Sequence, residues 1–181
     1  MQDGETVLLI GDSITDCGRR GAEMSLGSGN VRMVTELTTA RYPDCDIKYI
    51  NKGIGGNRIT NLKDRWQDDV FYHSPDKLSI KIGIDDLHSH LGAADGVSPK
   101  QFGSIYDELL EKTVFKLNCP VLLVTPFYVS TDRSGQTFRS RVLDLIPEYI
   151  NVVVGMSEKF GTKIVNLHDT FQKQLEYKDP E

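Results

Sequence analysis

The stretch Val7-Leu8-Leu9-Ile10-Gly11-Asp12-Ser13-Ile14-Thr15-Asp16 decides the fold of this chain. Its four apolar residues predict a short buried strand, which Gly11-Asp12-Ser13 then ends. Open α/β sheets place ligands and catalytic groups at the carboxyl ends of their strands. A serine at such a position can face a cleft, with a general base and N–H donors close to it. The same residues also favour an ordinary turn, so this stretch alone leaves both interpretations open.

Two further predicted strands also end in small and polar residues. The predicted strand 46–51 leads into Asn51-Lys52-Gly53-Ile54-Gly55-Gly56-Asn57, whose glycines allow close approach to a ligand or a positive φ. The predicted strand 77–82 leads into Gly83-Ile84-Asp85-Asp86. In a doubly wound sheet these two strand ends can face the same crevice as Ser13. Convergence of the three motifs favours a functional site over three unrelated turns.

The composition of the chain excludes several classes of protein. The chain has 181 residues, 39% hydrophobic and 26% charged, which predicts a single domain over residues 1–181. Its net charge of −5 leaves no basic surplus for nucleic acid, and no apolar run is long enough to cross a membrane. No cysteine pair or carboxylate cluster has metal-ligand spacing, so we expect neither a metal nor a cofactor. Few cysteines and no signal-peptide pattern predict a cytoplasmic location.

Apolar periodicity predicts strands that alternate with helices. The predicted strands are 6–10, 46–51, 77–82, 121–125 and 163–167, and the predicted helices are 31–40, 60–68, a long helix from Pro99, and 138–159. Thr60 and Ser98 are predicted to cap helices, and Pro147 predicts a kink or two abutting helices. Residues 15–29 and 92–96 are predicted to form loops. This alternation is typical of an α/β fold with three layers, α/β/α, around a parallel sheet.

The three strand-end motifs resemble those of the SGNH/GDSL hydrolases, a family of serine esterases and lipases on a flavodoxin-like fold. The matching blocks are Gly11–Asp16, Asn51–Asn57 and Gly83–Asp86, and the resemblance covers nearly the whole chain. It implies a five-stranded parallel sheet in the order 2-1-3-4-5. It also implies that Ser13 is the nucleophile and that the backbone N–H groups of Ser13 and Gly56 form part of the oxyanion hole.

Asp85 stands where the family has an Asn side chain that serves as the third oxyanion donor. An ionised carboxylate only accepts hydrogen bonds and would repel an oxyanion. A protonated Asp85 could donate a hydrogen bond, which requires a strongly raised pKa. In a third arrangement the side chain turns away and holds the loop. The sequence leaves these three arrangements open.

The general base of the family comes from an Asp-x-x-His block near the C-terminus, and no such block precedes Glu181 near the end of this chain. The chain is therefore expected to be truncated at its C-terminus or to have lost its base. His88 and His90 follow the third block and could approach the cleft as a substitute base, although they are interpreted first as surface loop residues; His73 and His168 are interpreted as structural residues. The family's last helix is missing as well, so we expect an uncovered sheet face and a homodimer or aggregate.

These residues favour a serine esterase that hydrolyses a small acyl ester, such as an acetylated sugar or another short-chain ester, with impaired activity. Its partner would be a small-molecule ester. The alternative is a non-catalytic SGNH-like protein that binds a glycan, an ester or a protein through the same cleft. A third hypothesis is a nucleotide binder that uses the Gly53–Gly56 loop, although Arg58 breaks the G-x-G-x-x-G spacing.

Overall fold

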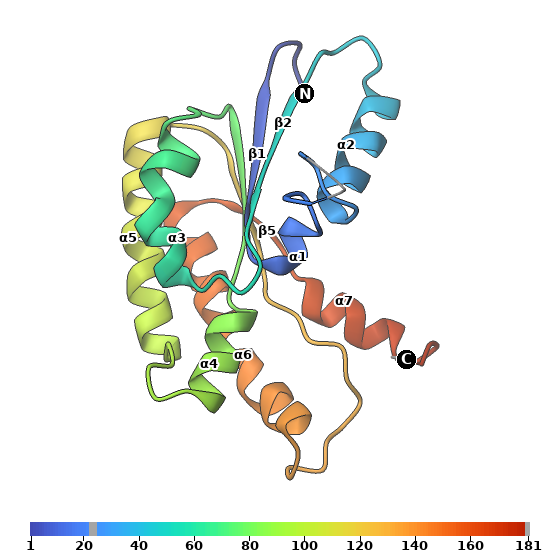
Figure 1. The fold of residues 1–181 in the computed structure, drawn as a ribbon, viewed down its shortest axis with the longest axis vertical. Coiled ribbons are helices and arrows are strands. Elements are labelled where there is room, and N and C mark those ends of the chain that lie inside the picture. The colour runs from blue at the N-terminus through green and yellow to red at the C-terminus, as the bar shows by residue number, and fades with distance from the viewer. Residues whose placement is uncertain (22–24, 180–181) are drawn as a thin grey trace.

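The fold is built on a five-stranded parallel sheet in the order β2-β1-β3-β4-β5 (Figure 1). The computed structural model describes residues 1–21 and 25–179. The strands are β1 (Thr6–Gly11), β2 (Lys48–Gly53), β3 (Lys77–Lys81), β4 (Val121–Val124) and β5 (Lys163–Val165). This order confirms the expected topology, and each strand lies within two or three residues of its predicted position.

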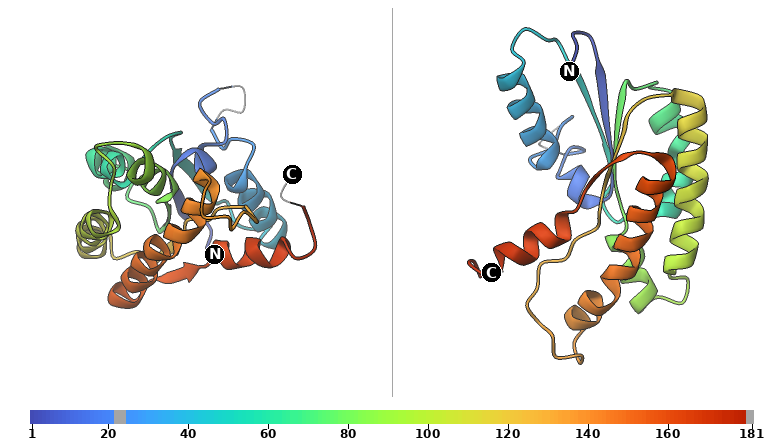
Figure 2. Two further views of the ribbon diagram at one scale, coloured as in Figure 1. Left: turned by 90° about the horizontal axis from the view of Figure 1, so that it is seen from below. Right: turned by 180° about the vertical axis from the view of Figure 1, so that it is seen from behind.

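Helices lie on both sides of the sheet. They are α1 (Ser13–Asp16), α2 (Asn30–Arg41), α3 (Ile59–Trp66), the π-helical turn η1 (Gln67–Phe71), α4 (Ile84–Gly92), α5 (Pro99–Leu117), α6 (Phe138–Phe160) and α7 (Leu167–Gln174). Figures 1 and 2 show α3, α5 and α6 on one side of the sheet and α1 and α2 on the other. The α/β/α layering is therefore confirmed.

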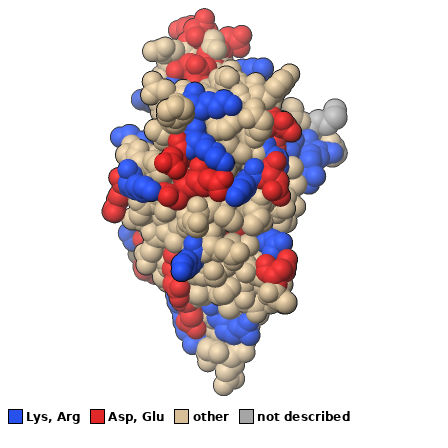
Figure 3. All heavy atoms as spheres, turned by 90° about the vertical axis from the view of Figure 1, so that its left-hand side faces the viewer, with Lys and Arg blue, Asp and Glu red and all other residues tan. Residues whose placement is uncertain are grey.

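The side of the sheet under α3, α5 and α6 holds the main core. Alternate strand residues such as Leu8, Ile10 and Ile80 pack there against Trp66 and Phe102, and all five are almost fully buried. Outside this core, α3 and α5 carry interspersed basic and acidic side chains, as Figure 3 shows, with ion pairs such as Lys63–Glu108. This face therefore lacks the continuous basic patch that a nucleic-acid surface requires.

The opposite side of the sheet is covered less completely. Val7 and Leu9 pack with Val31 of α2 in a small second cluster. Further along the sheet, β5 is exposed over its whole length, with Ile164 38% and Val165 39% exposed. Helix α7 runs away from the sheet and leaves this part open (Figure 2). The open part agrees with the expected uncovered face, whereas self-association stays a prediction.

Two short helices begin where the sequence predicted turns and loops. Ser13 starts α1, and α4 covers residues 84–92, so His88 and His90 lie on a helix and the prediction of a surface loop is wrong. Both helices begin with Asp and Ser or Gly residues, which favour turns in sequence but also favour helix starts. The apolar residues Ile84, Leu87 and Leu91 have helical spacing, which the prediction overlooked.

Two predictions about longer helices also need correction. Residues 138–160 form one helix with Pro147 inside it, so the two abutting helices are not found. Buried neighbours such as Ile146 and Tyr149 hold the helix together across the missing N–H of the proline. Helix α3 begins after Arg58 and not after Thr60. Its first N–H, from Ile59, donates to the carboxylate of Asp86 in α4, a tertiary cap that no local pattern reveals.

Candidate active site

Ser13 is an exposed residue at the carboxyl end of β1 and the first residue of α1. Asp12 caps this helix, because its Oδ1 accepts a hydrogen bond of 2.9 Å from the N–H of Ile14. The N–H groups in the first turn of a helix have no acceptor within the helix. The Ser13 N–H lies in this first turn, and its role as an oxyanion donor stays a prediction.

The glycine loop after β2 lies directly beside Ser13. A Cβ atom added to Gly55 would be 3.8 Å from the Cβ of Ser13. The N–H of Gly55 donates to the carboxylate of Asp16 over 3.0 Å, so it is not free to cradle a phosphate, which weakens the nucleotide hypothesis. Gly56 is exposed with φ +77°, and its N–H makes no hydrogen bond within the described residues. The Gly56 N–H is therefore open to an outside acceptor, and its role as an oxyanion donor stays a prediction.

The carboxylate of Asp16 holds the Ser13 helix and the glycine loop together. Besides the Gly55 N–H, it binds Arg20, whose guanidinium lies 2.8 Å away. Burial by itself would raise the pKa of Asp16, but the Gly55 N–H and Arg20 hold that pKa below its usual range. Asp16 therefore remains ionised and keeps both contacts over a wide pH range.

Asn51 of β2 also joins the Ser13 helix to the segment that leads into the glycine loop. Its side-chain nitrogen donates to the carbonyl groups of Thr15 and Leu26 over 2.7 and 2.8 Å, and its oxygen accepts the N–H of Gly53 over 2.8 Å. A Cβ atom at Gly53 would be only 2.1 Å from the backbone nitrogen of Asp16. Both residues belong to the second sequence block. Their contacts, called the Asn51 clamp below, join separate segments and could not be predicted from local sequence.

Asp85 lies in the first turn of α4 at the same edge of the sheet. Its Oδ2 is buried and has no hydrogen-bond partner among the described residues. Burial raises the pKa of Asp85, and the nearby Asp12 carboxylate raises it further, whereas His88 and Lys81 act in the opposite direction. The structure thus brings Asp85 close to the Ser13 region with a carboxyl group that holds its proton more tightly than usual.

Asp86 has a structural position despite standing next to Asp85. It is fully buried, and its Oδ1 accepts the N–H of Ile59 over 2.9 Å. Burial raises the pKa of Asp86 to about 7, because the charged form loses its hydration. Asp86 therefore joins α4 to the start of α3, a contact that Asp85 does not share.

No histidine in residues 1–21 and 25–179 forms a hydrogen bond with Ser13. His88 is half-buried, and its ring lies 5.7 Å from that of Tyr128 and 5.4 Å from that of Phe138. Burial lowers the pKa of His88, and the nearby Asp85 carboxylate counteracts this effect in part. His168 is buried, and its Nδ1 accepts the N–H of Tyr128 over 3.3 Å, in agreement with the structural role expected for it.

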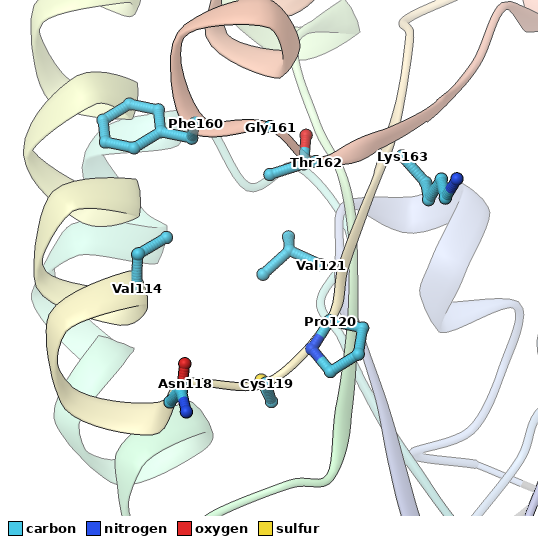
Figure 4. Close-up of a pocket in the computed structure, with 9 residues that line it drawn as sticks. All are labelled: Val114, Asn118, Cys119, Pro120, Val121, Phe160, Gly161, Thr162 and Lys163. Carbon is cyan, nitrogen blue, oxygen red and sulfur yellow. The ribbon is translucent and has the colours of Figure 1, made fainter.

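A cavity of about 320 Å³ lies away from Ser13, at the opposite edge of the sheet (Figure 4). Its lining includes Val114 from α5, Val121 from the start of β4 and Phe160 from the end of α6. These residues lie at the amino ends of β4 and β5, so this cavity is not part of the candidate site. Within the described residues, no three His, Cys, Asp or Glu side chains are grouped as metal ligands, and no helix has the length and apolar character to span a bilayer.

Comparison with known proteins places this geometry in a family. The sequence profile of the GDSL-like lipase/acylhydrolase family matches residues 9–180. An acetylxylan esterase from Geobacillus stearothermophilus is 35% identical over 180 residues, which cover 95% of this chain and 80% of that protein. A crystal structure of a catalytic mutant of Axe2, an acetylxylan esterase from the same species, matches with a TM-score of 0.88 and 32% identity and covers 99% of this chain and 84% of that chain.

A second enzyme extends the comparison. LAE5, an α/β hydrolase from the metagenome of Lake Arreo in Spain, matches with a TM-score of 0.87 and 28% identity over 99% of this chain and 84% of its own. Among the matching Axe2 structures are catalytic mutants in which a serine, an aspartate or a histidine is replaced by alanine. The chain belongs to the GDSL-like lipase/acylhydrolase family and is an ester hydrolase of the SGNH type.

Proposed function

We propose that this chain is a serine esterase that hydrolyses short acyl esters, foremost acetyl esters of a sugar, with Ser13 as the nucleophile. The observation that carries the proposal is the placement of Ser13. It is exposed, begins a capped helix at the carboxyl end of β1, and lies beside the Gly53–Gly56 loop. The 35% identity to an acetylxylan esterase supports the choice of an acetyl ester.

The reaction would follow the usual course of acyl transfer. The Ser13 hydroxyl attacks the ester carbonyl while a general base takes its proton, and the carbonyl oxygen becomes an oxyanion. The N–H groups of Ser13 and Gly56 stabilise that oxyanion. Collapse of the tetrahedral intermediate expels the alcohol and leaves Ser13 acylated. Water then attacks the acyl group, which releases the acid and restores the Ser13 hydroxyl.

Asp85 contributes the third oxyanion donor in this proposal, in the form that carries a proton. A neutral carboxyl group has one O–H and can replace the amide N–H that the family uses. Support comes from the buried Oδ2 without a partner and from the raised pKa of Asp85. An ionised Asp85 would oppose the oxyanion, so activity is expected to fall as the pH rises through its pKa.

The described residues offer Ser13 no general base, and the proposed activity of this 181-residue chain is therefore impaired. The alternative function, binding of a glycan, an ester or a protein partner without catalysis, is favoured by the same observation. The two functions differ in whether Ser13 changes the rate of ester cleavage, and this difference can be measured directly.

The experiment compares hydrolysis of p-nitrophenyl acetate by the parent chain and by Ser13→Ala. We expect Ser13→Ala to lower the rate by at least about 10³-fold if the parent is fully active, and to the uncatalysed background in any case. Ser28→Ala is the matched control, since Ser28 is an exposed serine whose hydroxyl donates to the carbonyl of Cys17. Equal rates for parent and Ser13→Ala would contradict the esterase function, and binding of an acetylated xylo-oligosaccharide would then support the alternative.

Location and assembly form a further part of the proposal. Cys17, Cys45 and Cys119 are free thiols, which supports a reducing compartment such as the cytoplasm. The exposed apolar residues of β5 support a homodimer of this chain, and its acidic charge balance supports the absence of a nucleic-acid partner. Light scattering at high concentration tests the dimer, and a monomer mass would contradict it.

A further inference from the structure

Lys81 is a charged residue inside the sheet. It is the last residue of β3, pairs in register with Gly11 of β1, and is only 3% exposed. Lysine side chains are almost never buried to this degree unless they are paired. Lys81 belongs to none of the three sequence blocks, and no step of the proposed reaction uses it.

The partner of Lys81 is Asp12, the residue before Ser13. The ammonium nitrogen lies 3.3 Å from both carboxylate oxygens of Asp12, which is 0% exposed. Burial lowers the pKa of Lys81, and the Asp12 carboxylate counteracts this effect. Apolar side chains can usually replace a buried ion pair without loss of stability. An ion pair buried directly behind the proposed nucleophile therefore points to a role in the site.

Asp12 links this ion pair to the nucleophile. The Oδ1 that faces Lys81 also accepts the N–H of Ile14 and so caps α1. Helix α1 has only four residues, which is too short for a helix to persist without external contacts. The orientation of its first residue, Ser13, thus depends on the Asp12 cap, and the cap depends on a counter-charge for the buried carboxylate.

Two aromatic rings shield this ion pair. The Lys81 ammonium lies 5.2 Å from the centre of the Phe127 ring, and Phe127 stacks on Phe171 of α7 with ring centres 4.4 Å apart. Because the rings and the sheet enclose the ammonium, solvent cations have little access to the Asp12 carboxylate. Lys81 is therefore the counter-charge on which the cap relies.

We propose that Lys81 is a positioning residue for Ser13, whose ammonium group neutralises and orients the Asp12 carboxylate so that it caps α1 and fixes the serine. Lys81 acts through Asp12 and does not touch the substrate. Its structural effect is independent of the proposed function, and only its kinetic effect rests on the esterase activity of Ser13.

The test compares Lys81→Met, the double variant Asp12→Asn/Lys81→Met, and the control Lys77→Met. Lys77 lies on the same strand, at the opposite edge of the sheet, and pairs with Glu5. Hydrogen exchange followed by NMR should show faster exchange of the α1 amides of Asp16 and Cys17 in Lys81→Met, by about 10-fold or more. Exchange of these amides should be unchanged in Lys77→Met.

The double variant keeps the test decisive even if Lys81→Met fails to fold. It contains no buried charge at these two positions, and asparagine is as good a helix cap as aspartate. We therefore expect the double variant to fold and to protect the α1 amides as the parent does. Parent-like exchange in Lys81→Met, or rapid α1 exchange in a folded double variant, would overturn the positioning role.

Kinetics provide a second readout. In Lys81→Met, kcat should fall by about 10²-fold with little change in KM, because the serine is displaced while the substrate contacts remain. The double variant should regain a kcat near that of the parent. A low kcat in a double variant with normal exchange would overturn the proposal, since the ammonium charge would then act on the reacting groups directly. An inactive parent chain would contradict the proposed function, while the exchange experiment would still decide the role of Lys81.

Discussion

The carboxyl edge of the sheet has two halves that are organised differently. In the half around β1 and β2, the carboxylates next to Ser13 each have a cation, Asp12 the ammonium of Lys81 from β3 and Asp16 the guanidinium of Arg20, although the Oδ1 of Asp16 has no hydrogen-bond partner among the described residues. In the half formed by β3 and α4, the Oδ2 atoms of Asp85 and Asp86 and the Nε2 of His88 are buried without hydrogen-bond partners among the described residues.

The first half fixes the position of Ser13, and the second half binds and releases protons as the pH changes. Contacts within the chain hold the Ser13 half in one arrangement, because its ion pairs and the Asn51 clamp leave little freedom. The Asp85 half contains two carboxyl groups whose pKa values are raised, so its charge changes with pH. Substitutions in the first half should alter activity at every pH. Substitutions in the second half should alter how activity or stability depends on pH.

Among substitutions around the two halves, the largest combined loss of activity and stability is expected for Gly53→Ala. The added methyl group would lie 2.1 Å from the backbone nitrogen of Asp16, so α1 and Ser13 must move. We expect ester hydrolysis to fall by about 10²-fold and the free energy of unfolding to fall by about 1–3 kcal/mol. Urea unfolding checks the stability, with Gly55→Ala as control, whose methyl group meets no atom closer than 3.8 Å. Equal destabilisation by the two substitutions would show that the close packing at Gly53 is unimportant.

Asp85→Asn tests the second half through the reaction. The pKa of Asp85 is raised, so the parent loses its proposed O–H donor as the pH increases, whereas an amide keeps its N–H donors. Above the raised pKa of Asp85 the variant should be faster than the parent by up to about 10²-fold, and the two rates should converge as the pH falls below that pKa. A pH profile of kcat/KM for the parent and Asp85→Asn measures this. Profiles of the same shape would mean that Asp85 does not face the oxyanion.

Asp86→Asn should change the pH dependence of stability. The pKa of Asp86 in the folded chain is about 7, above its unfolded value, so the stabilising proton is fully bound at low pH and lost as the pH rises towards 7. The parent should therefore lose up to about 4 kcal/mol of unfolding free energy between about pH 4 and pH 7. Asp86→Asn should remove this part of the slope in urea titrations. A variant with the same slope as the parent would assign the pH dependence to other groups.

The smallest effect is expected at an ion pair outside both halves. Asp95 binds Arg58 over 3.3 Å, but its side chain is 76% exposed to solvent. Asp95→Asn should change the free energy of unfolding by less than about 0.5 kcal/mol and leave ester hydrolysis unaltered. A large loss of activity in this variant would extend the site beyond the two halves compared here.

Most of the sheet could be predicted from the sequence, whereas the short helices could not. Continuous apolar runs such as Val7–Ile10 and Val121–Val124 mark buried parallel strands, and their order followed from the family resemblance. Helices α1 and α4 were missed because Gly, Asp and Ser residues start helices and form turns equally well. The structure resolves that ambiguity, since tertiary contacts such as Asp86 to Ile59 stabilise these helix starts.

The motifs predict Ser13, Gly56 and Asp85 as site residues, but they did not reveal the residues that hold this region in place. Lys81 alternates with Lys77 and Ser79 along β3, a pattern typical of a strand face exposed to water. Its burial depends on Phe127, which comes from a distant loop, and on the position of Asp12. Such a contact is set by the whole fold and not by local sequence.

The most direct test of Ser13 as the nucleophile is to map the serine that a covalent probe modifies. The chain would be incubated with a fluorophosphonate, which reacts covalently with activated serines, and the adduct would be located by peptide mass spectrometry. We expect a single adduct on Ser13 that forms slowly, because the described residues supply no general base, and that disappears in Ser13→Ala and persists in Ser28→Ala. An adduct on another residue, or no adduct on the folded chain, would contradict the claim that Ser13 is the nucleophile of an ester hydrolase.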